Sequence, residues 1–334
     1  MAEIEVPHPR EVFELQGQYV AEEAFEAARG RGRLHHAWLL TGPEGVGKAT
    51  FAYRAARRLL GAPADPDLGV LGTDPDHPVA RQVAARSHPD LMVLEREGPD
   101  GKARKVIPVD DARKLAEFFS KSPASAPHRV AIVDAADDLN VNSANAILKT
   151  LEEPPPRGVL LMVSHAPGRL LPTIRSRCRR LAFQPLGVEA AADFVRARTG
   201  ANDEDALRLA TMADGAPGRA LQLAAGQALA MDDAARDLLA DLPRVDETRA
   251  LSLAEGFRGG EGPAKFALLF ERLSDRVHAL ARDRAAQGFG ALDRWAGAWE
   301  TLQRLPREVE ALNLDRADAL FTALAELRQA AAQA

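Results

Sequence analysis

Short apolar runs alternate with helical patterns through the first half of the chain. The runs are "HAWLL", "PDLMVLE", "RVAIVD", "GVLLMVSHAP" and "RRLAF", which lie between residues 36 and 183. Their length and apolar content are typical of buried strands. Strands that alternate with helices predict a parallel sheet with helices on its faces.

Helical periodicity fills the segments between these runs. One predicted stripe is formed by Phe51, Ala52, Ala55, Ala56, Leu59 and Leu60. A second helix is predicted at 109–122, before Pro123. In residues 140–153 apolar side chains recur with helical spacing, and three prolines from Pro154 end that helix. Residues 61–80 are rich in Pro, Gly and Asp and predict an irregular excursion.

The pattern changes after residue 187, beyond which no strong strand signal follows. Long amphipathic helices are indicated by Phe266, Phe270, Leu273, Val277 and Leu280, and by Leu320, Leu324 and Leu327. We therefore predict an α/β plus all-α chain with three domains. These are a parallel-sheet domain at 1–183, a small helical lid at 184–229 and a helical domain at 230–334.

Composition excludes several classes of protein. The formal net charge of −5 shows that the surface as a whole is not built to bind a polyanion, although a local basic patch is compatible with it. A single cysteine, Cys178, excludes an internal disulfide and a cysteine-rich zinc site. The acidic, proline-broken N-terminus predicts no signal or transit peptide, and no apolar run reaches the length of about 20 residues that a membrane span requires. We expect a cytoplasmic protein with no membrane contact.

A phosphate-binding loop is predicted at residues 42–48. "GPEGVGK" matches the pattern G-x-x-x-x-G-K between a strand and a helix. Gly42, Gly45 and Gly47 allow backbone N–H groups to turn toward a phosphate, and the helix N-terminus and Lys48 add positive charge. The alternative is a glycine-rich turn without a ligand.

The magnesium site that such a loop needs is incomplete. Ala49 stands where the pattern has Ser or Thr, so the hydroxyl that holds Mg²⁺ is missing. Thr50 does not replace it directly, because one residue along a helix rotates a side chain by about 100°. Thr50 is retained only as a candidate contact of a bound nucleotide.

The acidic side of the site is incomplete as well. Asp134 ends an apolar strand, as the metal-binding Asp of a P-loop ATPase does, but Ala135 follows where Glu is usual. Asp137 and Asp138 are expected in a solvated turn or a helix cap instead. Two separate losses predict that intrinsic ATP hydrolysis is weak or absent.

Four segments carry a family resemblance: "RLHHAWLLTGPEGVGKA", "SHPD", "RVAIVDAADDLNVNSANAILKTLEEPPP" and "LLPTIRSRCRRLAF". Together they resemble the delta-prime family of clamp-loader subunits of bacterial DNA polymerase III, within the AAA+ class. The resemblance covers residues 1 to about 225 with specific motifs and rests on helical pattern alone beyond them. It implies an AAA+ P-loop module, a helical lid and a C-terminal collar that joins subunits.

The resemblance also implies partners and a catalytic arginine. Such subunits stand in a ring with gamma or tau ATPase subunits and a delta subunit, and the ring loads the sliding clamp onto primed DNA. The Arg of the Ser-Arg-Cys triplet, Arg177, is implied to be an arginine finger for the ATP of the neighbouring subunit. The alternative is that Arg177 is one of a surface cluster with Arg175, Arg179 and Arg180.

Other positions resemble family residues less specifically. Ser164 corresponds to a polar sensor of the γ-phosphate, with a strand-end Ser bonded to backbone as the alternative. Arg219 resembles the second-sensor Arg of the lid, with a lid surface residue as the alternative. Glu152 and Glu153 are expected to end a helix, in a segment that packs in the core of the module.

The chain departs from the family at its zinc module. Many delta-prime proteins carry four cysteines in the stretch that corresponds to residues 61–88, which here contains none. His77 and His88 alone cannot build a tetrahedral site. We predict no zinc, and an excursion that is held by local packing or left mobile. ATP or ADP is expected only as a structural ligand that is not hydrolysed.

Three functions follow from these observations. The favoured one is a non-hydrolysing component of the DNA polymerase III holoenzyme that completes a partner's ATP site. An active gamma/tau-type clamp-loader ATPase is the alternative, which Ala49 and Ala135 oppose. The third is a scaffold without an arginine finger, and substitution of Arg177 separates it from the first.

Overall fold

The computed structural model describes residues 4–96, 104–286 and 292–332. The chain forms two compact units, Met1–Ala225 and Gly226–Ala334. The lid predicted at 184–229 falls largely within the first unit, and its treatment as a separate domain stays a prediction. Within the three described ranges, no helix combines the length and the apolar character needed to cross a membrane.

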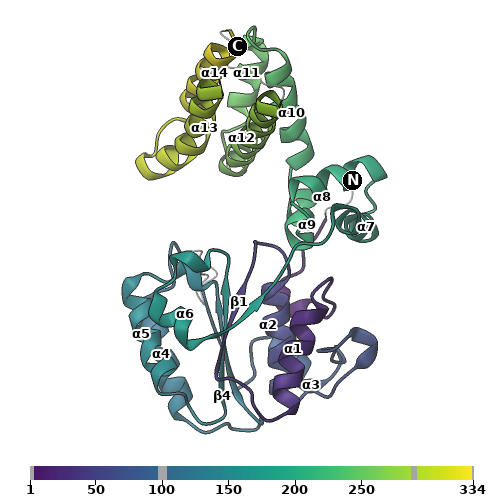
Figure 1. Cartoon of the computed structure of the whole chain (residues 1–334), viewed down its shortest axis with the longest axis vertical. Helices are drawn as coiled ribbons and strands as arrows, with labels where there is room; N and C mark the ends of the chain where they lie inside the picture. Colours follow the sequence, from purple (N-terminus) through teal and green to yellow (C-terminus); the bar gives the residue numbers. More distant parts are fainter. Residues whose placement is uncertain (1–3, 97–103, 287–291, 333–334) are drawn as a thin grey trace. The chain divides into compact units, whose positions relative to one another are not determined.

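A five-stranded parallel sheet forms the centre of the first unit (Figure 1). Its strands are β1 Ala37–Thr41, β2 Leu91–Glu95, β3 Arg129–Asp134, β4 Gly158–Ser164 and β5 Arg179–Ala182, in the order β2-β3-β4-β1-β5. Each strand overlaps one of the predicted apolar runs, so the predicted parallel α/β fold is confirmed. Because carboxyl ends of parallel strands share one edge, Thr41, Asp134 and Ser164 end their strands on the same side of the sheet.

Helices cover both faces of this sheet. In Figure 1, α1, α2 and α3 lie on one side and α4, α5 and α6 on the other. The helices of the first unit are α1 Tyr19–Gly30, α2 Lys48–Leu59, α3 Pro78–Ala84, α4 Val109–Ser120, α5 Val141–Glu152, α6 Pro172–Arg177, α7 Val188–Thr199, α8 Asp203–Met212 and α9 Pro217–Ala225. Short 3₁₀ turns occupy η1 Pro9–Glu11, η2 Pro66–Leu68, η3 Ala136–Asp138 and η4 Pro167–Arg169.

Helix α2 is buried on more sides than its apolar stripe predicts. The stripe itself is buried as expected, but Arg54 and Arg57 are buried too, at 1% and 0% exposed. Arg54 forms a buried ion pair with Glu22 of α1 at 2.9 Å and donates to the carbonyl of Leu68 at 2.7 Å. Arg57 donates to the carbonyl of Val12 at 3.0 Å. Two arginines of α2 therefore anchor both the N-terminal segment and the excursion.

The excursion is held by packing rather than left loose. It contains η2 and α3, and its Leu71 is fully buried in the core of the sheet domain. The Arg54 bond to Leu68 ties it to α2. In the part of the chain that the structure describes, no cluster of three His, Cys, Asp or Glu side chains is arranged to hold a metal ion.

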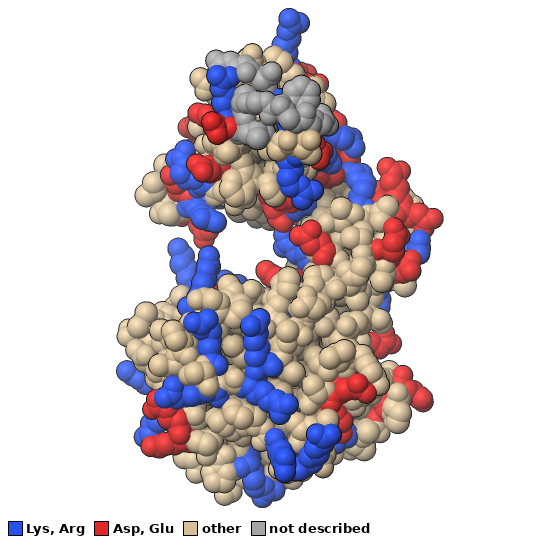
Figure 2. All heavy atoms as spheres, viewed as in Figure 1, with Lys and Arg blue, Asp and Glu red and all other residues tan. Residues whose placement is uncertain are grey.

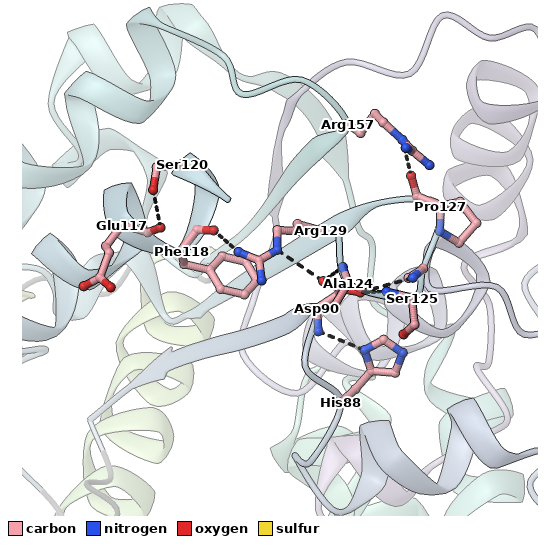
Figure 3. A network of polar contacts seen from close by, with 11 residues as sticks. His88, Asp90, Glu117, Phe118, Ser120, Ala124, Ser125, Pro127, Arg129 and Arg157 are labelled. Carbon is pink, nitrogen blue, oxygen red and sulfur yellow. Dashed lines mark hydrogen bonds and ion pairs between the residues drawn. The ribbon is translucent and has the colours of Figure 1, made fainter. Parts of the chain in front are cut away.

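The "SHPD" segment builds a buried network around Asp90 (Figure 3). The Asp90 carboxylate is fully buried and accepts the backbone N–H groups of Ala124, Ser125 and Ala126 at 2.8–3.1 Å. It also accepts Arg129 Nε at 3.2 Å, while the Arg129 guanidinium lies 4.5 Å from the centre of the Phe118 ring. Burial raises the pKa of Asp90, but these four donors outweigh it and hold the pKa below its usual value. Asp90 thus fixes the loop between α4 and β3.

The second unit is helical, as the sequence predicts. It consists of α10 Ala228–Ala240, α11 Glu247–Glu255, α12 Gly262–Ala286, α13 Leu292–Leu312 and α14 Arg316–Ala332. The predicted stripes on α12 and α14 lie in its core, with Leu280 only partly buried. Polar contacts join the helices: Arg276 of α12 pairs with Asp232 of α10 at 2.7 Å, and Gln303 of α13 donates to Ser274 of α12 at 2.6 Å.

Candidate functional site

The predicted phosphate loop joins β1 to α2 at the carboxyl edge of the sheet. Gly42, Gly45 and Gly47 all adopt positive φ, and Gly47 is the left-handed residue from which α2 begins. A Cβ atom on Gly45 would lie 2.3 Å from the backbone nitrogen of Arg219, and one on Gly47 would lie 2.5 Å from a methyl group of Leu15. Only glycine combines these backbone angles with such close approaches.

The Lys48 side chain folds back on this loop. Its ammonium donates to the carbonyl of Gly42 at 2.6 Å and to that of Pro43. Burial lowers the pKa of Lys48 to about 8, against the opposing effect of Asp134, Glu44 and Asp137. Binding of a phosphate by Lys48 therefore requires exchange of loop carbonyls for phosphate oxygens.

Helix α9, in the segment predicted to form a lid, rests directly on the loop. The backbone N–H of Gly218 donates to the carbonyl of Gly45 at 2.8 Å, and Arg219 follows it against the same glycine. Gln18, buried at the start of α1, donates to the carbonyls of Val46 at 3.2 Å and Gln184 at 2.7 Å. The structure thus brings Arg219 to the phosphate loop. It also adds Gln18, which no spacing pattern in the sequence points to.

Asp137 lies in the η3 turn past the end of β3, but its carboxylate contacts the end of β4 and is not solvated as expected. Its carboxylate accepts the Ser164 hydroxyl at 3.0 Å and the backbone N–H groups of His165 at 2.6 Å and Ala166 at 3.1 Å. The expectation was wrong because β3 and β4 are neighbours, so the turn after one meets the end of the other. Ser164 correspondingly bonds to a carboxylate rather than to backbone.

His165 is a candidate site residue that sequence reasoning missed. It follows β4 directly, and Ser164 before it is paired in register with Thr41 at the start of the loop. Desolvation by the surrounding protein lowers the pKa of His165, and the nearby Lys48 ammonium lowers it further. Its position after a strand that neighbours β1 was the available signal.

The first turn of α2 contains two further positions that the sequence singles out. Ala49 and Thr50 lie in its first turn, one after the other, and both are partly buried. Neither Ala49 nor Ala135, which follows β3, provides an oxygen ligand from its side chain. The loop therefore has the shape of a phosphate cradle without the full set of magnesium ligands.

Asp134 provides a pH-dependent prediction. Burial raises the pKa of Asp134 to about 6, Glu95 raises it further and Lys48 opposes this. A carboxyl group whose pKa is raised on folding contributes stability below its unfolded pKa and loses it as the pH rises through the folded value. Between about pH 4.5 and pH 8, the free energy of unfolding of the unaltered chain is therefore expected to fall by about 1–2 kcal/mol relative to that of Asp134→Asn. Urea unfolding of both proteins at the two pH values measures this, and an unchanged difference contradicts the raised pKa.

Arg177 lies apart from the phosphate loop, at the C-terminal end of α6. Its Nη1 donates to the carbonyl of Thr173 at 3.0 Å, and its Nη2 forms an ion pair with Glu152 of α5 at 3.0 Å. The side chain is 34% exposed. Glu152 and Glu153 are exposed, so the expectation of a buried segment holds for the residues before them, such as Thr150 and Leu151, and not for the two glutamates.

The arginines around Arg177 differ in their contacts. Arg180 donates to the Thr41 hydroxyl at 2.9 Å, and the Arg179 guanidinium lies 4.9 Å from the centre of the Trp38 ring. Arg175 is exposed on α6. In Figure 2, blue side chains spread over the visible face of the first unit. The cluster is thus partly structural, and Arg177 differs from Arg179 and Arg180 in that its contacts lie on α5 and α6.

A family model and two curated relatives each match about half of the chain. Residues 17–187 match the family model described as "DNA polymerase III, delta subunit". The delta′ subunit of Pseudomonas aeruginosa is 40% identical over 167 residues, which are 50% of this chain and 48% of that protein. The delta′ subunit of Bacillus subtilis is 34% identical over 163 residues, 48% of this chain and 46% of that protein.

A tau subunit matches more of the chain at lower identity. The DNA polymerase III subunit tau of Escherichia coli is 30% identical over 291 residues, which are 84% of this chain and 41% of that protein. The chain thus spans about half the length, or less, of the curated relatives that it matches.

Proposed function

Since this chain belongs to the DNA polymerase III delta-subunit family, we propose that it is a delta-prime-type clamp-loader subunit that does not hydrolyse ATP itself. Its Arg177 reaches the ATP bound by a neighbouring gamma/tau-type ATPase subunit. The complex, which also holds a delta subunit, loads the sliding clamp onto primed DNA in the cytoplasm. The helical second unit is the collar through which the subunits join.

One observation carries this proposal. The guanidinium of Arg177 is presented at the surface, with both of its partners outside the chain's own phosphate loop. That loop is followed by Ala49, and β3 is followed by Ala135, so the side chains for magnesium and for water activation are missing on the same subunit. A subunit with an available arginine and an incomplete site of its own is suited to act on a neighbour's nucleotide.

The chain's own loop is proposed to hold ATP or ADP as a structural ligand only. The residues proposed to contact it are Gly42, Gly45, Gly47, Lys48, Thr50, Asp134, Ser164 and Arg219. The positive φ angles of the glycines, the start of α2 at Lys48 and the approach of Arg219 to Gly45 support this assignment. Lys48 would give up its bonds to the loop carbonyls in exchange for phosphate oxygens.

An active gamma/tau-type ATPase is the second candidate. The match of the Escherichia coli tau subunit to 84% of this chain favours it. The alanines at positions 49 and 135 oppose it, because they remove a metal ligand and the residue that polarises water.

The isolated chain is expected to hydrolyse ATP no faster than background. The measurement is steady-state phosphate release by the chain alone, by the gamma/tau-type subunit of the same organism alone, and by the reconstituted complex with clamp and primed DNA. The double variant Ala49→Thr, Ala135→Glu tests whether the two missing side chains account for inactivity. Turnover by the unaltered chain alone at the rate of the gamma/tau-type subunit favours the second candidate instead.

A further inference from the structure

The ends of helices α5 and α6 meet through one ion pair. Glu152, the last residue of α5, places Oε1 3.0 Å from Nη2 of Arg177, the last residue of α6. The other terminal nitrogen, Nη1, donates to the carbonyl of Thr173 at 3.0 Å, one turn earlier in α6. Two acceptors from α5 and α6 thus fix the direction of a guanidinium whose side chain is 34% exposed.

The position of Glu152 is itself fixed by the fold. Leu151 before it is buried, and the carbonyl of Leu151 lies 3.2 Å from Nε2 of His36, next to β1. The helix ends at Glu152 because Pro154 follows within two residues. The end of α5 is therefore held by the core, while the Glu152 carboxylate extends from it at the surface.

We propose that Glu152 is a positioning residue, which holds Arg177 in the orientation in which it meets the neighbour's nucleotide. This inference rests on the proposed function. A free arginine side chain loses conformational entropy when it is immobilised against a phosphate. A contact that already orders the side chain removes part of this entropy cost. The guanidinium offers more N–H donors than its two present contacts use, so donors remain for phosphate oxygens.

A carboxylate beside an arginine finger also has an opposing effect. It reduces the positive charge that the transition state meets. In the isolated chain the Glu152 side chain is 51% exposed, so water and salt weaken the effect of its negative charge. Screening does not remove the orientation that the contact imposes on Arg177. We therefore expect the positioning effect to exceed the loss of positive charge.

The test uses the reconstituted clamp-loader complex with clamp and primed DNA. Glu152→Ala is expected to lower kcat of ATP hydrolysis at the site completed by Arg177 about two- to fivefold, the factor that an exposed ion pair supplies. KM for ATP is expected to stay unchanged, because Glu152 contacts the arginine and not the nucleotide. Glu152→Gln, which retains an acceptor oxygen, is expected to recover part of the loss.

Two controls separate positioning from a general structural effect. Glu153→Ala removes the neighbouring exposed carboxylate, which makes no ion pair among the described residues, and is expected to leave kcat unchanged. In an Arg177→Ala background, Glu152→Ala is expected to have no further effect, since a positioning residue acts only through the residue that it positions.

The outcomes distinguish the inference from the function on which it rests. If Arg177→Ala lowers the rate while Glu152→Ala leaves it unchanged or raises it, the positioning role is wrong and the proposed function stands. A Glu152→Ala loss that persists in the Arg177→Ala background also contradicts positioning. If Arg177→Ala itself has no effect, the proposed function fails and takes the inference with it.

Discussion

Asp90→Asn is expected to destabilise the first unit by about 3–5 kcal/mol, as the removal of one partner from a buried ion pair does. The variant leaves Arg129, which is 8% exposed, without a countercharge. In the unaltered chain, the Asp90 oxygens accept the backbone N–H groups of Ala124, Ser125 and Ala126. In the variant, an amide NH₂ group replaces one of these oxygens and faces those donors. An asparagine has only one acceptor oxygen for these donors, so at least one is left unsatisfied in the interior.

Urea unfolding followed by tryptophan fluorescence measures this effect. The chain has three tryptophans, so the variants Trp295→Phe and Trp299→Phe leave Trp38, which is buried in β1, as the reporter of the first unit. Asp110→Asn is the matched control, because its ion pair with Arg113 is largely exposed, and it is expected to change stability by less than about 0.5 kcal/mol. A loss below about 1 kcal/mol for Asp90→Asn contradicts a central role for the carboxylate.

The pH dependence has a defined sign. The pKa of Asp90 is lowered on folding, so its contribution is present above the unfolded-state pKa and is lost as the pH falls through the folded value. The difference between the unaltered chain and Asp90→Asn is therefore expected to shrink in acid.

The sheet and the phosphate loop could be predicted because their signals are local. Each strand is an apolar run of its own, and the loop is a short spacing of glycines with Lys48 between β1 and α2. Parallel strands then bring Asp134 and Ser164 to the edge where the loop lies, without further information. These parts of the site follow from the fold class.

The parts that could not be predicted depend on contacts between distant segments. Helix α1 carries Glu22, whose burial makes sense only once Arg54 of α2 lies against it. The role of Asp137 depends on β4 lying beside β3. In the same way, the sequence predicts that Glu152 ends a helix, but it does not predict the partner of its carboxylate. The packing of α6 against α5 brings Arg177 to it. Charged residues that are paired across the fold have no periodicity to reveal them.

Arg177→Ala is expected to lower ATP hydrolysis at the neighbouring site about 10³-fold or more, which is the range that arginine fingers supply in GTPases. In the proposed function, the guanidinium neutralises charge that develops on the γ-phosphate, and its removal leaves that charge without the countercharge delivered from outside the nucleotide-binding subunit. The proposal confines the loss to the one ATP site that Arg177 is proposed to complete. Total ATPase is therefore expected to fall by the share of that site and of any turnover coupled to it. Pre-steady-state phosphate release resolves that site from the others.

Two companion variants and a stability measurement make the result specific to the guanidinium. Arg177→Lys keeps the charge but not the planar fork of donors, and is expected to recover little of the rate. Arg175→Ala removes an exposed arginine from the same helix and is expected to leave hydrolysis unchanged. Arg177 is partly exposed, and its polar partners among the described residues are the Glu152 carboxylate and the carbonyl of Thr173. Its substitution is therefore expected to change the stability of the isolated chain by less than about 1 kcal/mol. If Arg177→Ala leaves the clamp- and DNA-stimulated ATPase unchanged, the chain is a scaffold without an arginine finger. A loss of ATP hydrolysis at one site, in a protein of unchanged stability, supports a contact of Arg177 with the neighbour's phosphate.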